Sequence, residues 1–242
     1  MLVFSISSIL FDDKDTTFFR LFQIFIGVLT RKFRIFVYLC SDFNEILIYL
    51  SMANKPLDTT LLDRAIVYAV RAHAGTERRS KGFPYIVHPL EAVSIVATMT
   101  SDQELLAAAA LHDTVEDTDV TLEQIRAEFG DRVASFVAVE SDTPVLGMSE
   151  EDSWRIRKQA AIDRIANASH DAKMVALGDK LSNMRAIARD YAVQGDALWN
   201  LFRLKDRKEH EWHYRGLAAS LSELQDTFAY KEFEQLINQV WK

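Results

Sequence analysis

Four residues that can bind a metal ion or carry a proton follow an apolar run near the middle of the chain. The segment LLAAAALHDTVEDTDVT, residues 105–121, begins as leucine and alanine and then places His112, Asp113, Glu116 and Asp117 within six positions. At about 100° per residue, a helix would carry all four on one arc of roughly 140°. Three carboxylates on one face repel one another unless positive charge lies among them. A divalent cation would supply that charge, and adjacent His and Asp are suitable ligands for it.

The simpler interpretation of this segment is a solvated helix end, where acidic residues are common. The alanine-rich lead-in argues against it, because a helix that is apolar on most of its surface is expected to be buried. Ser101 and Glu104 have the spacing of a capping box, so the helix is predicted to begin at Asp102. The segment therefore favours a functional site over a solvated end.

Two further segments hold single residues of the same chemical kind. The stretch KGFPYIVHPL places His88 before a proline, although a lone histidine is more often structural than a ligand. The stretch VALGDKLSNMRAI places Asp179 in an apolar helical context, with Asn183 one turn later on the same face. A carboxylate there needs a partner. An ion pair with Lys180 or Arg185 explains Asp179 as well as a metal does.

The loop HAGTERRSKG concentrates Arg78, Arg79 and Lys81 in an acidic protein. One interpretation is a solvated loop. The other is an anion-binding site in which guanidinium groups hold phosphate and stack on a base. The local pattern leaves both open.

The whole chain has the composition of an ordinary globular protein, with 242 residues of which 49% are apolar and 26% charged. Its net charge of −7 and its pI near 5.4 argue against general binding to nucleic acid, which needs a basic surface. Cys40 is the only cysteine, which excludes a disulfide framework and a thiolate metal site. Such a chain suits a reducing compartment, so we predict a cytoplasmic protein; the sequence leaves its oligomeric state open.

Residues 1–51 differ in composition from the rest of the chain. Nine of the 15 phenylalanines lie there, with one glycine and no proline. The longest uncharged runs, at 1–11, 21–30 and 35–41, are shorter than the ~20 residues of a membrane-spanning helix, so no stable span is expected. No signal-peptide pattern is present. The segment is either interfacial or lies upstream of the true start codon at Met52. We favour the second interpretation and predict an extension at 1–51 outside a domain at 52–242.

From Thr59 onward, hydrophobic residues recur at helical spacing almost throughout. Gly and Pro interrupt the pattern between 75 and 84, and Thr121 and Gln124 form a second capping-box pattern before a short helix that ends at Gly130. Further helices are predicted at 89–99, at 131–140, at about 150–168, at about 171–190, and twice between 195 and 240. No alternating strand pattern persists. The chain is therefore predicted to form an all-α, single-domain bundle.

Three motifs together resemble those of one known family. They are H-x-G-x-x-R-R-x-x-G-x-P-Y-I-V-H-P-L, A-A-L-H-D-T-V-E-D-T and G-D-K-L-S-N-M-R. They resemble the HD-superfamily hydrolase domain of the RelA/SpoT alarmone enzymes, over about residues 65–217. An HD pair alone is unspecific, because many metal phosphohydrolases contain it, but the three motifs together are specific. The remaining residues are too few for a synthetase domain, so we expect a relative of the single-domain small alarmone hydrolases.

The resemblance implies a metal site and a general base. In the family, the His of the HP pair, both residues of the HD pair and the Asp of the DK motif hold a manganese ion. The matching residues here are His88, His112, Asp113 and Asp179. Two imidazoles and two carboxylates suit Mn²⁺, and the lack of cysteine ligands argues against structural zinc. The family's ED pair, which helps to activate the attacking water, matches Glu116 and Asp117.

The resemblance also implies the substrate, guanosine tetra- or pentaphosphate (ppGpp or pppGpp), whose 3′-pyrophosphate would be released to leave GDP or GTP. The family's basic pair, which contacts the base and the phosphates, matches Arg78 and Arg79, and Asn183 matches a residue near the sugar. His73 matches a histidine that the family does not use as a ligand. Candidates for more distal contacts are Arg157, Lys158, Tyr214 and Arg215.

The chain departs from the family pattern at three places. Thr76 stands where glutamine is usual and Gly178 where alanine is usual, and neither is a ligand. Glu140–Ser141 replaces a valine–threonine pair, which could alter contacts around the phosphate-binding loop. Two alternatives stay open: a phosphohydrolase for another nucleotide such as NADPH, and a non-catalytic module that binds alarmone. The second predicts a missing ligand or a missing ED pair, and none is missing.

Overall fold

The computed structural model describes residues 58–78, 81–141 and 145–242, and Asp58–Lys242 forms a compact unit. Within these ranges the regular secondary structure is helical, and the single bridge between Glu77 and Pro84 belongs to no strand. The helices are α5 (Thr60–Ala72), α6 (Val87–Val96), α7 (Gln103–Leu111), α8 (Thr114–Asp117), α9 (Leu122–Phe129), α10 (Asp131–Glu140), α11 (Trp154–Ala166), α12 (His170–Gln194), η1 (Gly195–Leu201), α13 (Arg207–Ser220), η2 (Ser222–Leu224) and α14 (Phe228–Val240). The predicted all-α fold is confirmed.

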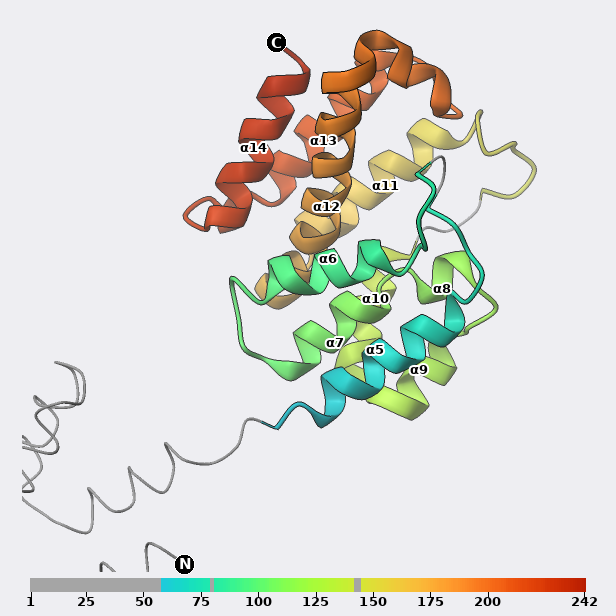
Figure 1. The fold of residues 1–242 in the computed structure, drawn as a ribbon, viewed down its shortest axis with the longest axis vertical. Coiled ribbons are helices and arrows are strands. Elements are labelled where there is room, and N and C mark those ends of the chain that lie inside the picture. Colours follow the sequence, from blue (N-terminus) through green and yellow to red (C-terminus); the bar gives the residue numbers. More distant parts are fainter. Residues whose placement is uncertain (1–57, 79–80, 142–144) are drawn as a thin grey trace, which may run out of the picture. The chain divides into compact units, whose positions relative to one another are not determined.

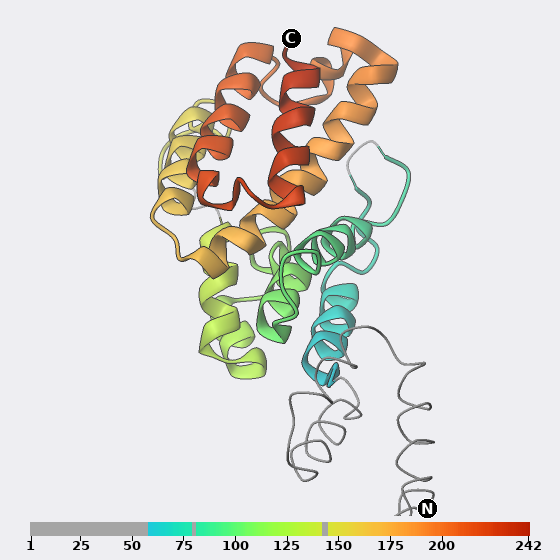
Figure 2. The ribbon, with the colours of Figure 1, turned by 90° about the vertical axis from the view of Figure 1, so that its left-hand side faces the viewer.

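The helices form two groups that α12 connects (Figures 1 and 2). The helices α5, α6, α7, α9 and α10 form the first group, and α11, α13 and α14 form the second. The long helix α12 packs on α6 and α7 of the first group and on α14 of the second. One helix therefore carries side chains into both halves of the domain.

The centre of the first group is α7, whose residues from Leu105 to Leu111 are all buried. Its alanines leave room for α5, α6, α10 and α12 to pack against it. Its start differs by one residue from the prediction, because Asp102 is the N-cap and accepts a hydrogen bond from the backbone N–H of Glu104 at 2.9 Å. The Glu104 carboxylate does not close a capping box but pairs with Arg132.

The contact between α6 and α12 is unusually close at Gly178. A Cβ atom at this position would lie 2.6 Å from Val96 Cγ2 and 3.0 Å from the carbonyl oxygen of Ala92. Only a residue without a side chain allows this approach. The departure from the family's alanine thus has a packing reason in this chain.

Other element boundaries follow the sequence to different degrees. The capping box of Thr121 and Gln124 is present in both directions, and α10 has the predicted bounds. The helix predicted at 89–99 is observed as α6, which begins two residues earlier, at Val87, and ends at Val96. Helix α11 begins later than expected, at Trp154, and α12 extends to Gln194. The predicted boundary between residues 51 and 52 lies outside the described residues. Among the described helices, none is long and apolar enough to cross a membrane.

An aromatic cluster holds the second group together. The ring of Trp199 in η1 stacks on the ring of Trp241 at 5.5 Å and on the imidazole of His210 at 5.2 Å. Tyr214 of α13 also stacks on Trp241, with the two ring centres 5.6 Å apart. These contacts join η1 and α13 to Trp241, the residue that follows α14.

Candidate functional site

The chain turns sharply where α7 ends, and this turn places the HD pair. Helix α7 stops at Leu111, and the short helix α8 begins at Thr114, whose hydroxyl donates to the Leu111 carbonyl oxygen at 2.6 Å. The prediction of one continuous helix through 117 is therefore wrong. Because of the turn, the side chains of His112 and Asp113 point into the domain, whereas Glu116 and Asp117 are exposed on α8.

His88 from α6 and Asp179 from α12 meet the HD pair at one point. The two imidazole Nε2 atoms are 3.2 Å apart, and Asp179 Oδ1 lies 3.0 Å from His88 Nε2 and 3.5 Å from His112 Nε2. Asp113 Oδ2 lies 3.0 Å from His112 Nε2 and 3.3 Å from His88 Nε2. All four candidate ligands are thus brought together from three separate parts of the sequence.

This arrangement fits a divalent cation. His112 Nδ1 lies 2.8 Å from the carbonyl oxygen of Ala109. A carbonyl only accepts, so Nδ1 carries hydrogen and the lone pair of the neutral ring is on Nε2, facing the cluster. Adjacent ligands of an octahedral ion at ~2.1 Å lie about 3 Å apart, which is close to the separations observed. His88, His112 and Asp179 are also buried and offer ligand atoms within 4.8 Å of one another. Asp113 lies outside this group of three, although its Oδ2 is within 3.3 Å of both imidazole Nε2 atoms.

The electrostatics of the cluster also favour positive charge at its centre. Burial lowers the pKa of His112, but the Asp113 and Asp179 carboxylates outweigh burial and raise that pKa well above its usual value. Burial raises the pKa of Asp113, but His112 and His88 outweigh it and hold that pKa well below its usual range. The carboxylates are therefore ionised, and they attract either a proton or a metal ion to the imidazole of His112.

Asp179 divides its two oxygens between two roles that the sequence left as alternatives. Its Oδ1 faces the imidazoles and accepts from Asn183 Nδ2, while its Oδ2 pairs with the ammonium of Lys180. Burial raises the pKa of Asp179, but Lys180 and His112 outweigh it and hold that pKa well below its usual range. The ion pair and the ligand-like geometry coexist.

Sequence reasoning missed the residue that completes this ion pair. Lys180 Nζ also lies 2.8 Å from Oε2 of Glu140, whose side chain is only 2% exposed. Glu140 was recognised as a departure from the family pattern, but no local signal pairs α10 with α12. One half-buried lysine thus lies between two carboxylates.

Tyr85, another residue that the sequence did not single out, closes the Asp113 side of the cluster. Its hydroxyl donates to Asp113 Oδ2 at 2.7 Å, and burial followed by the charges of Asp113 and Asp117 raises its pKa. His73 stacks on its ring at 4.8 Å and lies outside the ligand cluster, as the sequence suggested. Asp117 follows Asp113 by one helical turn, and its backbone N–H donates to the Asp113 carbonyl oxygen at 2.9 Å. This contact places Asp117 next to the cluster.

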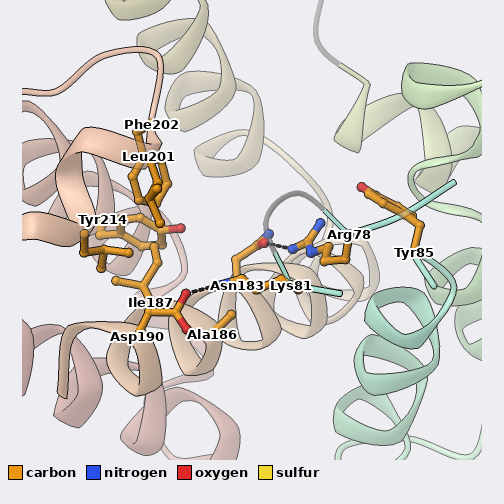
Figure 3. Close-up of a pocket in the computed structure, with 11 residues that line it drawn as sticks. Arg78, Lys81, Tyr85, Asn183, Ala186, Ile187, Asp190, Leu201, Phe202 and Tyr214 are labelled. Carbon is orange, nitrogen blue, oxygen red and sulfur yellow. Dashed lines mark hydrogen bonds and ion pairs between the residues drawn. The ribbon is translucent and has the colours of Figure 1, made fainter. Parts of the chain in front are cut away.

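A pocket of about 260 Å³ lies between the basic loop and the second group of helices (Figure 3). At one end Arg78 donates to Asn183 Oδ1, and its guanidinium lies 5.1 Å from the centre of the Tyr85 ring. Lys81 pairs there with Asp190 of α12. The other end is apolar and is lined by Leu201, Phe202 and Tyr214, and Leu198 also lines the pocket. The pocket thus offers cationic groups at one end and ring-sized apolar walls at the other.

The remaining substrate candidates have different positions. Arg79 lies outside the described residues. Tyr214 lines the pocket, whereas Arg215 bonds to Glu211 and to the backbone of Trp241, on the α14 side of α13. The Leu198–Phe202 wall was missed, because no motif marks these residues.

Comparisons with known proteins agree with this geometry. Residues 65–205 match the family model described as HD domain. A zebrafish protein named guanosine-3′,5′-bis(diphosphate) 3′-pyrophosphohydrolase MESH1 is 35% identical over 134 residues, which cover 54% of this chain and 71% of that protein. The human protein of the same name is 37% identical over 125 residues, covering 50% and 66% of the two chains. An Aquifex aeolicus guanosine-3′,5′-bis(diphosphate) 3′-pyrophosphohydrolase is 33% identical, with only 19% of its length covered.

Two solved structures share the fold. One is a metazoan ortholog of SpoT described as hydrolysing ppGpp, with a TM-score of 0.62 and 24% identity over 76% of this chain and 98% of that one. The other is lmo0812 from Listeria monocytogenes, with a TM-score of 0.57 and 26% identity over 67% of this chain and all of that one. Both are matched over almost their whole length by the helical unit.

Proposed function

Because this chain belongs to the HD-domain family, and to its branch of MESH1-like and RelA/SpoT-like proteins, we propose that it hydrolyses the 3′-pyrophosphate of ppGpp or pppGpp. The products would be pyrophosphate and GDP or GTP. The observation that carries this proposal is the convergence of His88, His112, Asp113 and Asp179 on one point, next to a pocket with cationic and apolar ends.

These four residues would hold a divalent cation, which we propose to be Mn²⁺. Two imidazole nitrogens and two carboxylate oxygens support a manganese-like ion, and Lys180 pairs with the Asp179 oxygen that faces away from the imidazoles. When bound, such a cation supplies Lewis-acid activation of water and of the phosphoryl group. The protein's own part is to keep the four donors fixed and largely dry.

Glu116 and Asp117 would accept the proton of the attacking water. They lie on α8 directly after the HD pair, exposed to solvent and therefore open to substrate. Proton transfer by a positioned carboxylate typically contributes ~10²–10⁴-fold in rate. A carboxylate that faces solvent can also release the proton after each turnover.

Arg78, Arg79 and Asn183 would bind the nucleotide. Arg78 donates to Asn183 at one end of the pocket, and Asn183 in turn donates to Asp179 of the metal cluster. Guanidinium groups bind phosphate oxygens in pairs, and the apolar wall of Phe202 and Tyr214 suits a base or ribose. We further propose a cytoplasmic protein that does not bind nucleic acid, in keeping with its acidic charge.

The test is a substrate panel. Full-length protein, stripped with a chelator and resupplied with Mn²⁺, is incubated with ppGpp, pppGpp, GTP and NADPH, and the released pyrophosphate and phosphate are measured. We expect pyrophosphate from ppGpp or pppGpp and none from GTP. Phosphate release from NADPH alone would replace the proposed substrate with the alternative one. Binding of ppGpp without turnover would instead identify a sensor.

A further inference from the structure

The imidazole of His88 is held on its far side by side chains rather than by the backbone. Its Nδ1 lies 2.8 Å from the hydroxyl of Ser182 on α12, and that hydroxyl donates to Glu91 Oε2 on α6 at 2.8 Å. Arg185 contacts Glu91 Oε1 at 3.3 Å. His88 and Ser182 are both buried, with 4% and 2% of their surface exposed. These contacts form a relay from the metal cluster toward α14.

The far end of the relay is anchored in the second group of helices. The Nε and a terminal nitrogen of Arg185 each lie 2.7 Å from an oxygen of Glu232 on α14. This two-pronged ion pair orients the guanidinium. Glu91 therefore faces a fixed cation on one oxygen and the Ser182 hydroxyl on the other.

The direction of the hydrogen bonds in this relay follows from the inventory of donors. A serine hydroxyl has one hydrogen. A carboxylate paired with arginine only accepts, so the hydrogen of Ser182 goes to Glu91 and a lone pair faces His88. The Nδ1 atom of His88 must then donate, which leaves the lone pair of the neutral ring on Nε2, aimed at the cluster.

We propose that Ser182 is a positioning residue, with Glu91 and Arg185 as its anchor, and that this relay sets the tautomer of His88 and thereby the affinity of the site for a divalent cation. The relay reproduces with three side chains what the Ala109 carbonyl does for His112. The effect on metal affinity rests on the proposed metal site; the effect on the tautomer does not.

Substitution of Glu91 by Gln gives the sharpest test. The Gln oxygen would stay toward Arg185, so its NH₂ group would donate to Ser182, and the hydroxyl hydrogen would turn to His88 Nδ1. The ring would then carry hydrogen on Nε2, only 3.2 Å from His112 Nε2, and would offer no lone pair to a cation. Ser182→Ala removes the acceptor altogether and leaves the tautomer unspecified.

The readout is ¹⁵N NMR of histidine-labelled, chelator-treated protein, in which six histidines are to be assigned. We expect His88 to carry hydrogen on Nδ1 in the wild type, on Nε2 in Glu91→Gln, and to show a mixture in Ser182→Ala. The Mn²⁺ dissociation constant, measured by electron paramagnetic resonance, should rise about 10- to 100-fold in both variants. Ser94→Ala is the matched control, because Ser94 is an exposed serine on α6, the helix that carries His88 and Glu91. It should change neither the tautomer of His88 nor the Mn²⁺ dissociation constant.

The outcomes separate this proposal from the proposed function. An unchanged His88 tautomer in both Glu91→Gln and Ser182→Ala would overturn the relay, whatever the enzyme hydrolyses. A changed tautomer with unchanged Mn²⁺ affinity would overturn its link to the metal. A changed tautomer and weakened Mn²⁺ binding in a protein that leaves ppGpp intact would support the relay and refute the proposed reaction. Thermal melting of each variant excludes global unfolding as the cause.

Discussion

The two imidazoles that face each other across the site are held in opposite ways. At the α7–α8 corner, His112 is fixed by the carbonyl of Ala109, three residues earlier in the last turn of α7. At the α6–α12 crossing, His88 is fixed by a hydroxyl 94 positions away in the sequence. The corner is thus made by local backbone geometry, whereas the crossing exists only when two distant helices pack correctly. The difference teaches that the crossing is the more easily perturbed half of the site.

The largest effect is expected from removing a ligand on either side. His112→Ala at the corner and Asp179→Ala at the crossing should each abolish both bound Mn²⁺ and pyrophosphate release, because each removal leaves buried charges unpaired and a donor missing. Metal content after dialysis and turnover of ppGpp are measured together. His170→Ala, an exposed histidine at the start of α12, should change neither. Full activity in Asp179→Ala would remove α12 from the metal site.

The second effect separates the two functions of the corner. A Glu116→Gln, Asp117→Asn double variant should lower kcat by at least ~10², because a positioned base is lost while the ligands remain. Its Mn²⁺ affinity should equal that of the wild type. Glu123→Gln, an exposed acid on the neighbouring helix α9, is the control. A parallel fall in metal content and turnover would mean that the exposed pair binds the ion.

A smaller effect tests the closeness of the crossing. Gly178→Ala would bring a methyl group 2.6 Å from Val96 Cγ2 and 3.0 Å from a backbone oxygen. Overpacking of this kind costs about 1–3 kcal/mol, and it should push His88 and Ser182 apart, weakening Mn²⁺ binding as well. The melting temperature and the Mn²⁺ dissociation constant are measured.

Gly216→Ala provides the matched control for this prediction. Its new Cβ would also lie 2.6 Å from a neighbour, but that neighbour is Ile162 Cδ1, the end of a side chain that can rotate. We expect little change in stability and none in metal affinity. Equal losses in both glycine variants would show that the α6–α12 distance is not critical to the site.

Starting the chain at Met52 is expected to change neither turnover nor thermal stability. All candidate ligands and both helices of the crossing lie after this position. The shortened protein should therefore hydrolyse ppGpp at the same rate and melt at a similar temperature. Aggregation or a large loss of turnover would show that residues 1–51 belong to the folded unit.

Sequence alone predicted the parts of the site that depend on local pattern. The HD pair and the buried α7 lie where the apolar run placed them, and Thr121 caps α9 as its spacing indicated. Motif resemblance then brought in His88 and Asp179, whose meeting with the HD pair no periodicity could reveal. The fold class followed from the absence of alternation.

What could not be predicted depends on distant contacts. The expected capping box of Ser101 and Glu104 is absent, because the Glu104 carboxylate pairs with Arg132 from α10 and Asp102 is the N-cap. The turn between α7 and α8 could not be predicted, because the helical pattern of the sequence continues through His112 and does not show that His112 and Asp113 face inward. The pairing of Ser182 with Glu91 and that of Glu140 with Lys180 leave no mark in the sequence, since each joins two different helices.

The meeting of ligands from positions 88, 112–113 and 179 also couples the metal to the survival of the fold. In an unfolded chain these donors are far apart, so a cation binds the native state almost exclusively, and at 100 times its dissociation constant it would add about 2.7 kcal/mol to the free energy of unfolding. Without the cation, the carboxylates would be left to attract a proton onto the buried imidazole of His112. Metal supply in the cell would then govern how long each molecule escapes unfolding and proteolysis, in addition to how fast it works.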